Sequence, residues 1–239
     1  VERIGIASAQ LDGRRKRGSG STIGRNIIYE NFGAGVMVTK DATQNTITQN
    51  SIYDNGTIGA ASGQIGIDLL AGGNEKAGDS PFVTLNDAGD GDSGGNGQLN
   101  FPILDTARTS GGNLILTGFA RPSAIIELFI ADGDPTGFGE GKTYLTTLTE
   151  GSGSDLDNTT GSYGPGHVNN LLQGSDTTNR FRFEVPLPAG VSGGTLLTAT
   201  ATLGASTSEF SGHVPVDPPD IYGSVFEDLN GDADPADGQ

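Results

Sequence analysis

An eleven-residue string that occurs twice limits what this chain can fold into. The string reads STIGRNIIYEN at residues 21–31 and NTITQNSIYDN at residues 45–55, so the two copies are offset by 24 residues. Six positions match in the two copies, namely Thr22/Thr46, Ile23/Ile47, Asn26/Asn50, Ile28/Ile52, Tyr29/Tyr53 and Asn31/Asn55. A fixed period of this length is typical of solenoids, in which each repeat forms one coil that stacks on the next.

Matching positions of a solenoid lie above one another. We therefore expect Ile23 to stack on Ile47, and Ile28 on Ile52, where short parallel strands pair from coil to coil. The matched asparagines are expected at the corners in left-handed backbone, which Asn tolerates better than most residues. A Gly-led apolar step follows each copy, at residues 35–38 and 66–69.

This pattern resembles the right-handed parallel β-helix repeat of bacterial surface proteins and of polysaccharide-active enzymes. Residues 4–6, Ile-Gly-Ile, fit the remains of one preceding coil. Solenoids normally need about three or more stacked units plus caps. The expectation is therefore a chain that continues upstream of Val1, or an end coil that another subunit covers.

Composition narrows the class of protein. The chain has 239 residues, 40 glycines, no cysteine and a net charge of −16, which together favour a turn-rich β protein without disulfides. Residues 1–40 hold seven Lys/Arg against three Asp/Glu, and the remainder holds six against 26. An acidic body repels nucleic acid and anionic membranes and attracts divalent cations. No apolar run approaches the roughly 20 residues that span a bilayer, so neither nucleic acid nor membrane insertion is expected.

The chain divides by pattern into four segments. Residues 1–78 are interpreted as β-helix coils, and residues 79–100 as a linker dense in glycine and aspartate. In residues 101–216, apolar and polar side chains alternate, most clearly at residues 180–185, with further strands expected at residues 113–117, 124–130, 143–148 and 195–202. Short strands broken by turn clusters predict a sandwich. The predicted fold class is thus all-β: a short right-handed parallel β-helix followed by an Ig-like β-sandwich.

Three motifs carry a second resemblance. They are NDAGDGDSGGNGQLNFPIL at residues 86–104, GFGEG at 137–141 and TATATLGASTSEFS at 198–211. In this order they resemble a module found after β-helix repeats in large secreted bacterial proteins, which implies an extracellular or cell-surface location and little chemistry. The polar insert at residues 151–179 departs from that module, and we expect a surface loop there, with binding left open.

The last segment, residues 217–239, starts with a proline pair that is typical of a semi-rigid linker. YGSVF at residues 222–226, followed by an acidic loop, resembles the first strand of the B-type repeat modules of serine–aspartate-rich surface adhesins. Only the opening motif is present, so we expect the sequence to stop within that unit.

Calcium is the cofactor that the acidic loops predict. In the tail, oxygen donors stand at alternate positions and one further on, at Asp228, Asn230, Asp232, Asp234 and Asp237. Calcium takes about six to eight oxygen ligands, and carboxylates this close repel one another without a cation. The alternative is a solvated acidic linker.

Two weaker acidic groups are also candidates. Asp87, Asp90 and Asp92 follow Asn86 among glycines and could bind a cation or form a hinge. Asp132, Asp134 and Glu140 could also bind a cation, or they could belong to a hairpin turn.

These features favour an extracellular structural or adhesive protein, a subunit or module of a cell-surface fibre or matrix filament with calcium-stiffened joints. Catalysis is not expected, since acid pairs such as Glu127 and Glu140 arise in any acidic β protein. The basic run at residues 14–17 predicts head-to-tail self-association with an acidic surface of a neighbour. The alternative is a carbohydrate-binding or polysaccharide-degrading module that contacts sugar through Tyr29, Tyr53, Tyr163 or the insert.

Overall fold

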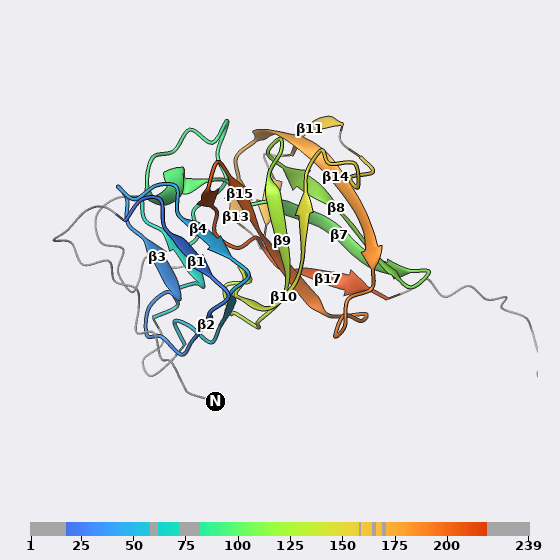
Figure 1. Ribbon diagram of the computed structural model, residues 1–239, viewed down its shortest axis with the longest axis horizontal. Helices are drawn as coiled ribbons and strands as arrows, with labels where there is room; N and C mark the ends of the chain where they lie inside the picture. The colour runs from blue at the N-terminus through green and yellow to red at the C-terminus, as the bar shows by residue number, and fades with distance from the viewer. Residues whose placement is uncertain are drawn as a thin grey trace, which may run out of the picture.

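The computed structural model describes residues 18–57, 62–71, 82–157, 159–163, 166–168 and 171–218. Within these ranges every regular element is a β-strand except one 3₁₀ turn at Gly95–Gln98, which confirms the predicted all-β class. Short strands lie at one side of the molecule and long ones at the other (Figure 1). The same ranges contain no helix of the length and hydrophobicity that crossing a membrane requires.

The short strands form two layers. β1 (Thr22–Gly24), β2 (Ile27–Tyr29) and β3 (Val36–Val38) make the first, here named coil 1; β4 (Thr46–Thr48), β5 (Ser51–Tyr53) and β6 (Ile67–Leu69) make coil 2. Each strand of coil 1 pairs in parallel with its counterpart in coil 2, as β1–β4, β2–β5 and β3–β6. Ile23 is opposite Ile47 and Ile28 is opposite Ile52, so the stacking predicted from the repeat is confirmed.

The left-handed residues of the coils are not the asparagines. Arg25, Glu30, Gln49 and Asp54 have φ values of 59°, 54°, 52° and 56°, and each directly precedes a matched asparagine. The prediction that Asn supplies the left-handed corner is therefore wrong by one position. The preceding residue makes the turn, which leaves the asparagine side chain to bond with the neighbouring coil.

The long strands form one nine-stranded sheet, here named the large sheet. Its strands are β7 (Ile103–Ser110), β8 (Asn113–Ala120), β9 (Ile125–Ala131), β10 (Gly141–Thr149), β11 (Thr160–Tyr163), β14 (Asp176–Pro186), β15 (Leu196–Leu203), β16 (Ser206–Thr207) and β17 (Val214–Asp217). The order is β10-β9-β15-β17-β7-β8-β14-β11, with β16 paired to β15. β17 runs antiparallel to β15 and parallel to β7, and so links the two halves of the sheet.

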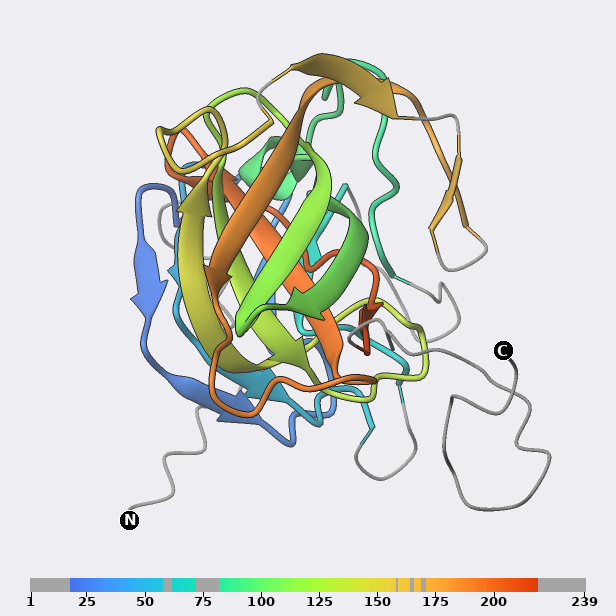
Figure 2. The same cartoon turned by 90° about the vertical axis from the view of Figure 1, so that its right-hand side faces the viewer.

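The large sheet curls so that its two halves face each other (Figure 2). Leu116 and Phe183 from one half pack in one buried cluster with Ile126 and Leu197 from the other. This arrangement is sandwich-like. Phe181 and Phe183 alternate with Arg180, which is exposed, and Arg182, which is partly exposed, and both phenylalanines, each 1% exposed, lie in that core.

Most of the strands predicted for this region are present, whereas the insert differs. β8, β9, β10, β14 and β15 lie where alternation predicted them. The insert was expected to be a surface loop, yet β11 pairs with β14 at the edge of the large sheet, and β12 (Gly166–Val168) pairs with β13 (Leu171–Gln173). The loop prediction is wrong for these strands because each is only three or four residues long, too short to show an apolar alternation in the sequence.

Candidate functional site

A ladder of asparagine side chains joins coil 1 to coil 2. The backbone N–H and Nδ2 of Asn26 donate to Asn50 Oδ1 at 2.9 and 3.1 Å, and those of Asn31 donate to Asn55 Oδ1 at 3.2 and 2.7 Å. Asn50 and Asn55 are 2% and 0% exposed, so the acceptors of these bonds are shielded from solvent, whereas the donors Asn26 and Asn31 are partly exposed. A polar group left unpaired at such a position is costly. The ladder therefore fixes the register of the two coils.

The edge of coil 2 that faces away from coil 1 meets side chains of the large sheet. Glu140 Oε2 accepts a hydrogen bond from the Asn55 N–H at 3.0 Å, and Oε1 accepts one from Asn55 Nδ2 at 2.8 Å. Asn55 Oδ1 accepts the same two kinds of donor from Asn31. The Glu140 carboxylate thus occupies the place that an asparagine of a next coil would take.

Two further glutamates of the large sheet make equivalent contacts. Glu127 accepts bonds from Thr48 Oγ1 and from the Gln49 N–H, at 2.5 and 2.8 Å. Glu209 accepts a bond from the Leu69 N–H at 2.8 Å. Glu127, Glu140 and Glu209 are 4%, 1% and 1% exposed. Each of the three strands of coil 2 therefore ends at, or is followed by, an N–H bonded to a buried carboxylate.

Neutral side chains complete this edge. The Ile47 N–H donates to Thr207 Oγ1 at 2.9 Å, and the Asn45 N–H donates to Asn96 Oδ1 at 2.9 Å. Asn96 Nδ2 returns bonds to the carbonyls of Asn45 and Thr207. Asn96 belongs to the segment predicted as a linker, and here it packs between coil 2 and the large sheet. The five N–H groups of residues 45, 47, 49, 55 and 69, with their side-chain acceptors, are named the capped edge below.

Burial raises the pKa of two glutamates in the capped edge. Burial raises the pKa of Glu140 from 4.5 to about 8, and the negative charges of Asp134 and Asp132 act in the same direction, against hydrogen bonds from Asn55. Burial also raises the pKa of Glu209 from 4.5 to about 8, with the carboxylate of Asp68 adding to the rise. Both carboxyl groups therefore hold protons at pH values where an exposed glutamate is ionised.

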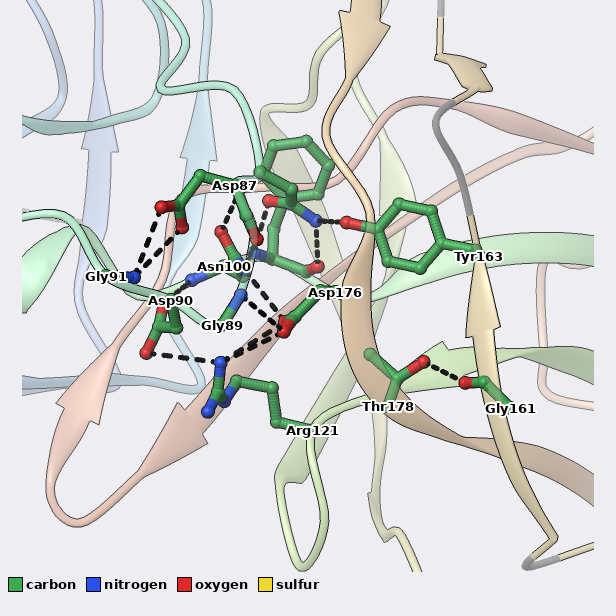
Figure 3. A network of polar contacts seen from close by, with 12 residues as sticks. Asp87, Gly89, Asp90, Gly91, Asn100, Arg121, Gly161, Tyr163, Asp176 and Thr178 are labelled. Carbon is green, nitrogen blue, oxygen red and sulfur yellow. Dashed lines mark hydrogen bonds and ion pairs between the residues drawn. The ribbon is translucent and has the colours of Figure 1, made fainter.

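The predicted cation ligands Asp87 and Asp90 lie in a second polar network (Figure 3). Both Asp87 carboxylate oxygens accept from the Gly91 N–H at 3.2 Å, and Asp90 Oδ1 accepts from the Asn100 N–H at 2.7 Å. Asn100 Nδ2 donates to Asp176 Oδ2 at 2.8 Å. Asp176, at the start of β14, is 2% exposed. The network ties the acidic loop to the large sheet.

Arg121 supplies the positive charge of this network. Its Nη1 lies 3.2 Å from Asp176 Oδ2 and 3.8 Å from Asp90 Oδ2, between the two carboxylates (Figure 3). Burial raises the pKa of Asp90, and the Arg121 charge and the Asn100 hydrogen bond oppose that rise. The guanidinium thus takes the position where a bound cation would neutralise the two acids.

The structure brings together only part of the predicted calcium ligands. Asp92 is exposed and takes no part in the hydrogen bonds described for the buried network. Among the residues that the structure describes, no group of three or more His, Cys, Asp or Glu side chains is arranged to hold a metal ion. Asp228, Asn230, Asp232, Asp234 and Asp237 lie outside the described residues. Calcium binding therefore stays a prediction for both groups.

The third acidic group is held by protein donors. Asp132 Oδ1 is 3.0 Å from Lys142 Nζ, and its Oδ2 accepts from the Asp54 N–H at 3.1 Å. Asp134 Oδ1 accepts from the N–H of Thr136 at 2.7 Å, as expected for a turn. Glu140 belongs to the capped edge. The hairpin-turn alternative therefore accounts for Asp134, and the other two acids contact the coils.

Replacing Arg121 with glutamine is expected to lower the free energy of unfolding by about 2 kcal/mol, because a buried carboxylate loses its counter-charge. Urea denaturation at neutral pH without calcium measures this loss. The matched control is Arg182→Gln, whose ion pair with Glu184 is solvent-exposed, with side chains 40% and 37% accessible, and is expected to change stability by less than about 0.5 kcal/mol. Equal effects of the two substitutions would contradict a structural role for Arg121.

The sequence analysis found the acidic loops, but it did not find the residues that contact them or the coils. Asp176 lies inside the insert that the sequence marked as unusual, and Glu209 lies inside the third motif, at residues 198–211.

Comparison with known proteins does not identify a family for this chain. No protein-family model matches the chain, and no curated protein is significantly similar to it. The interpretation of function therefore rests on the geometry and the sequence motifs.

Proposed function

We propose that this chain is a non-enzymatic structural module of an extracellular fibre or matrix filament, in which an Ig-like β-sandwich closes one end of a right-handed parallel β-helix. The capped edge carries this proposal. An open strand edge presents unpaired N–H and C=O groups that can pair with other chains. Here five N–H groups of coil 2 are bonded instead to side chains, four of them on or beside strands of the large sheet and one, Asn96, in the 3₁₀ turn at Gly95–Gln98.

The same contacts argue against a catalytic role for the buried acids. Glu127 and Glu140 are the pair that a glycosidase would need as acid and base. Each is engaged with two donors from coil 2, and each is at most 4% exposed. Their geometry supports joining two parts of the molecule rather than receiving a substrate.

Calcium would stiffen the joints between modules of the fibre. This part of the proposal is supported by the alternating oxygen donors at residues 228–237 and by the chain's net charge of −16. Isothermal titration calorimetry of the full chain, compared with an Asp232→Asn/Asp234→Asn variant, tests it. Equal calcium binding by both proteins would show that the ion binds outside the loop at residues 228–237. If neither protein binds calcium, the calcium part of the proposal is wrong.

Head-to-tail contact between the basic run at residues 14–17 and an acidic surface is the proposed mode of assembly. Reversing all four charges to glutamate is expected to weaken self-association, whereas changing Lys40 and Arg108 to glutamate is not. Sedimentation velocity with calcium, followed by negative-stain microscopy, measures this. A monodisperse monomer at high concentration with calcium would contradict the fibre proposal.

Carbohydrate binding is the second candidate, and one observation favours it. The rings of Tyr29 and Tyr53 stack with centroids 5.1 Å apart and planes 7° from parallel, and both side chains are partly exposed. Partly exposed aromatic surface of this kind can pack against sugar rings. Lys142 Nζ lies 4.8 Å from the Tyr53 centroid and covers part of it. A glycan array with the wild type and Tyr29→Ala distinguishes the candidates, since only sugar binding would depend on this ring.

A further inference from the structure

The capped edge contains two buried titratable groups that link separate parts of the chain. Glu140 lies just before β10, and Glu209 follows β16, while their donors Asn55 and Leu69 belong to coil 2. Both carboxyl groups are 1% exposed. They lose this environment only if coil 2 separates from the large sheet or the protein unfolds. Their protonation is therefore coupled to docking of the coils.

The charged groups around Glu140 are mostly acidic. Asp134 and Asp132, in the loop that follows β9, both raise the pKa of Glu140. Lys142 is paired with Asp132 at 3.0 Å, which partly compensates that charge. His213, on the other flank of this loop, is partly buried, and burial lowers the pKa of His213, so the imidazole is mainly neutral near pH 7. Coil 2 contributes Asp54 beside Lys142.

Glu209 has a simpler surrounding. Asp68 of β6 supplies a negative charge that raises the pKa of Glu209. The N–H groups of Leu69 and Thr84 donate to its two oxygens at 2.8 and 2.7 Å, and Thr84 Oγ1 donates to Oε1 at 3.2 Å. These donors favour the ionised form, but burial outweighs them. Both sites thus combine full burial with a neighbouring carboxylate, which favours the protonated form.

We propose that the contact between coil 2 and the large sheet is a proton-dependent clasp, which closes with protons on Glu140 and Glu209 and loosens as the pH rises. A carboxyl group with a pKa raised by folding contributes stability that is complete below its unfolded value and is lost as pH rises through its folded value. Here those values are 4.5 and about 8 for both residues. The contribution therefore declines between about pH 4.5 and pH 8.

Hydrogen–deuterium exchange of the intact protein measures the clasp directly. Once the intrinsic pH dependence of exchange is divided out, opening at the Asn55 and Leu69 amides is expected to increase by up to about tenfold per pH unit for each group between pH 5.5 and 8. Glu140→Gln and Glu209→Gln should each remove part of this dependence, since glutamine keeps an acceptor oxygen and cannot ionise. The double variant should remove most of it.

The matched control is Glu150→Gln. Glu150, directly after β10, is also a buried carboxyl, 2% exposed, but its donors are Asn179 Nδ2 on β14 and the Ser123 N–H in the turn between β8 and β9, so none of them comes from the coils. This variant should keep the wild-type pH dependence at Asn55 and Leu69. Opening that is independent of pH in the wild type, or unchanged pH dependence in the double variant, would overturn the proposal.

A second measurement covers the case in which a variant does not fold. Carboxyl-carbon NMR of the wild type, with glutamate labelled, follows the titration of Glu140 and Glu209 without any substitution. Two glutamate signals that titrate near pH 8 would support the clasp. Titration of every glutamate between about pH 4 and pH 5 would overturn it.

Discussion

Asn55→Ala is expected to lower the free energy of unfolding by about 3–5 kcal/mol, because it removes a side chain that bonds in both directions. Asn55 Oδ1 accepts two bonds from Asn31 of coil 1, and Nδ2 donates to Glu140 of the large sheet. Asn55 and Glu140 are shielded from water, at 0% and 1% exposed, while Asn31 is partly exposed. Alanine would leave the two Asn31 donors without their acceptor and would remove the Nδ2 donor to Glu140 Oε1, whereas Glu140 Oε2 would keep the backbone N–H of residue 55.

Urea denaturation at pH 6 and at pH 8 measures this loss. The larger loss is expected at pH 8, where a greater fraction of Glu140 is ionised and the missing donor matters more. The control is Asn113→Ala, which removes an exposed hydrogen bond of 3.1 Å to Glu184 and should cost less than about 0.5 kcal/mol. A loss below about 1 kcal/mol for Asn55→Ala would show that the Asn55 side chain does not hold coil 2 to coil 1 and to the large sheet.

Local repetition made the coils predictable. Six matched positions at one offset define which residues face which, and the observed register pairs Thr22, Ile23, Ile28 and Tyr29 with the counterparts read from the sequence. Alternation did the same for β14, where buried phenylalanines alternate with arginines that are exposed or partly exposed. In both cases the information lies within a few residues or in one short repeat.

The capped edge was not predictable in this way. Glu127, Glu140 and Glu209 bond to donors that are 78, 85 and 140 residues away in the sequence. Composition places acidic residues at the surface, because they are almost never buried without partners, and no local pattern indicates that these three have partners. The three sequence motifs were the available signal, since they contain Asn96, Glu140 and Glu209, although a motif alone does not tell what its residues contact.

The acidic network around Asp87 and Asp90 also depends on a partner that is distant in the sequence. The density of Asp and Gly at residues 86–92 predicted a cation site or a hinge within a linker, and calcium was the cation that such a pattern favours. The counter-charge seen in the structure is Arg121, on the chain segment between β8 and β9. A basic residue 31 positions from Asp90 carries no spacing signal, so the sequence could not indicate this partner, and calcium binding at the group stays a prediction.

Gly56→Ala is expected to lower the free energy of unfolding by about 2–5 kcal/mol, and it tests how tightly coil 2 closes. Gly56 has a φ of 69°, which costs a non-glycine residue about 1–2 kcal/mol. An added Cβ would also lie 2.2 Å from the Gln64 carbonyl oxygen and 2.7 Å from its backbone nitrogen. Backbone cannot rotate away as a side chain can, so overpacking adds about 1–3 kcal/mol.

Gly20→Ala separates the two contributions. Gly20 has a φ of 73°, but an added Cβ there meets nothing within 4 Å, so only the backbone term of about 1–2 kcal/mol remains. Thermal and urea denaturation of both variants give the difference, which reports the approach of residue 56 to residue 64. Equal losses would mean that this approach is loose in solution. The Gly63 N–H donates to the Gly56 carbonyl at 3.0 Å, and the Gly56 N–H donates to the Asn31 carbonyl at 2.9 Å. If residues 56 and 64 were not in close contact, these bonds would weaken, and the position of Asn55 next to Glu140 would be less fixed.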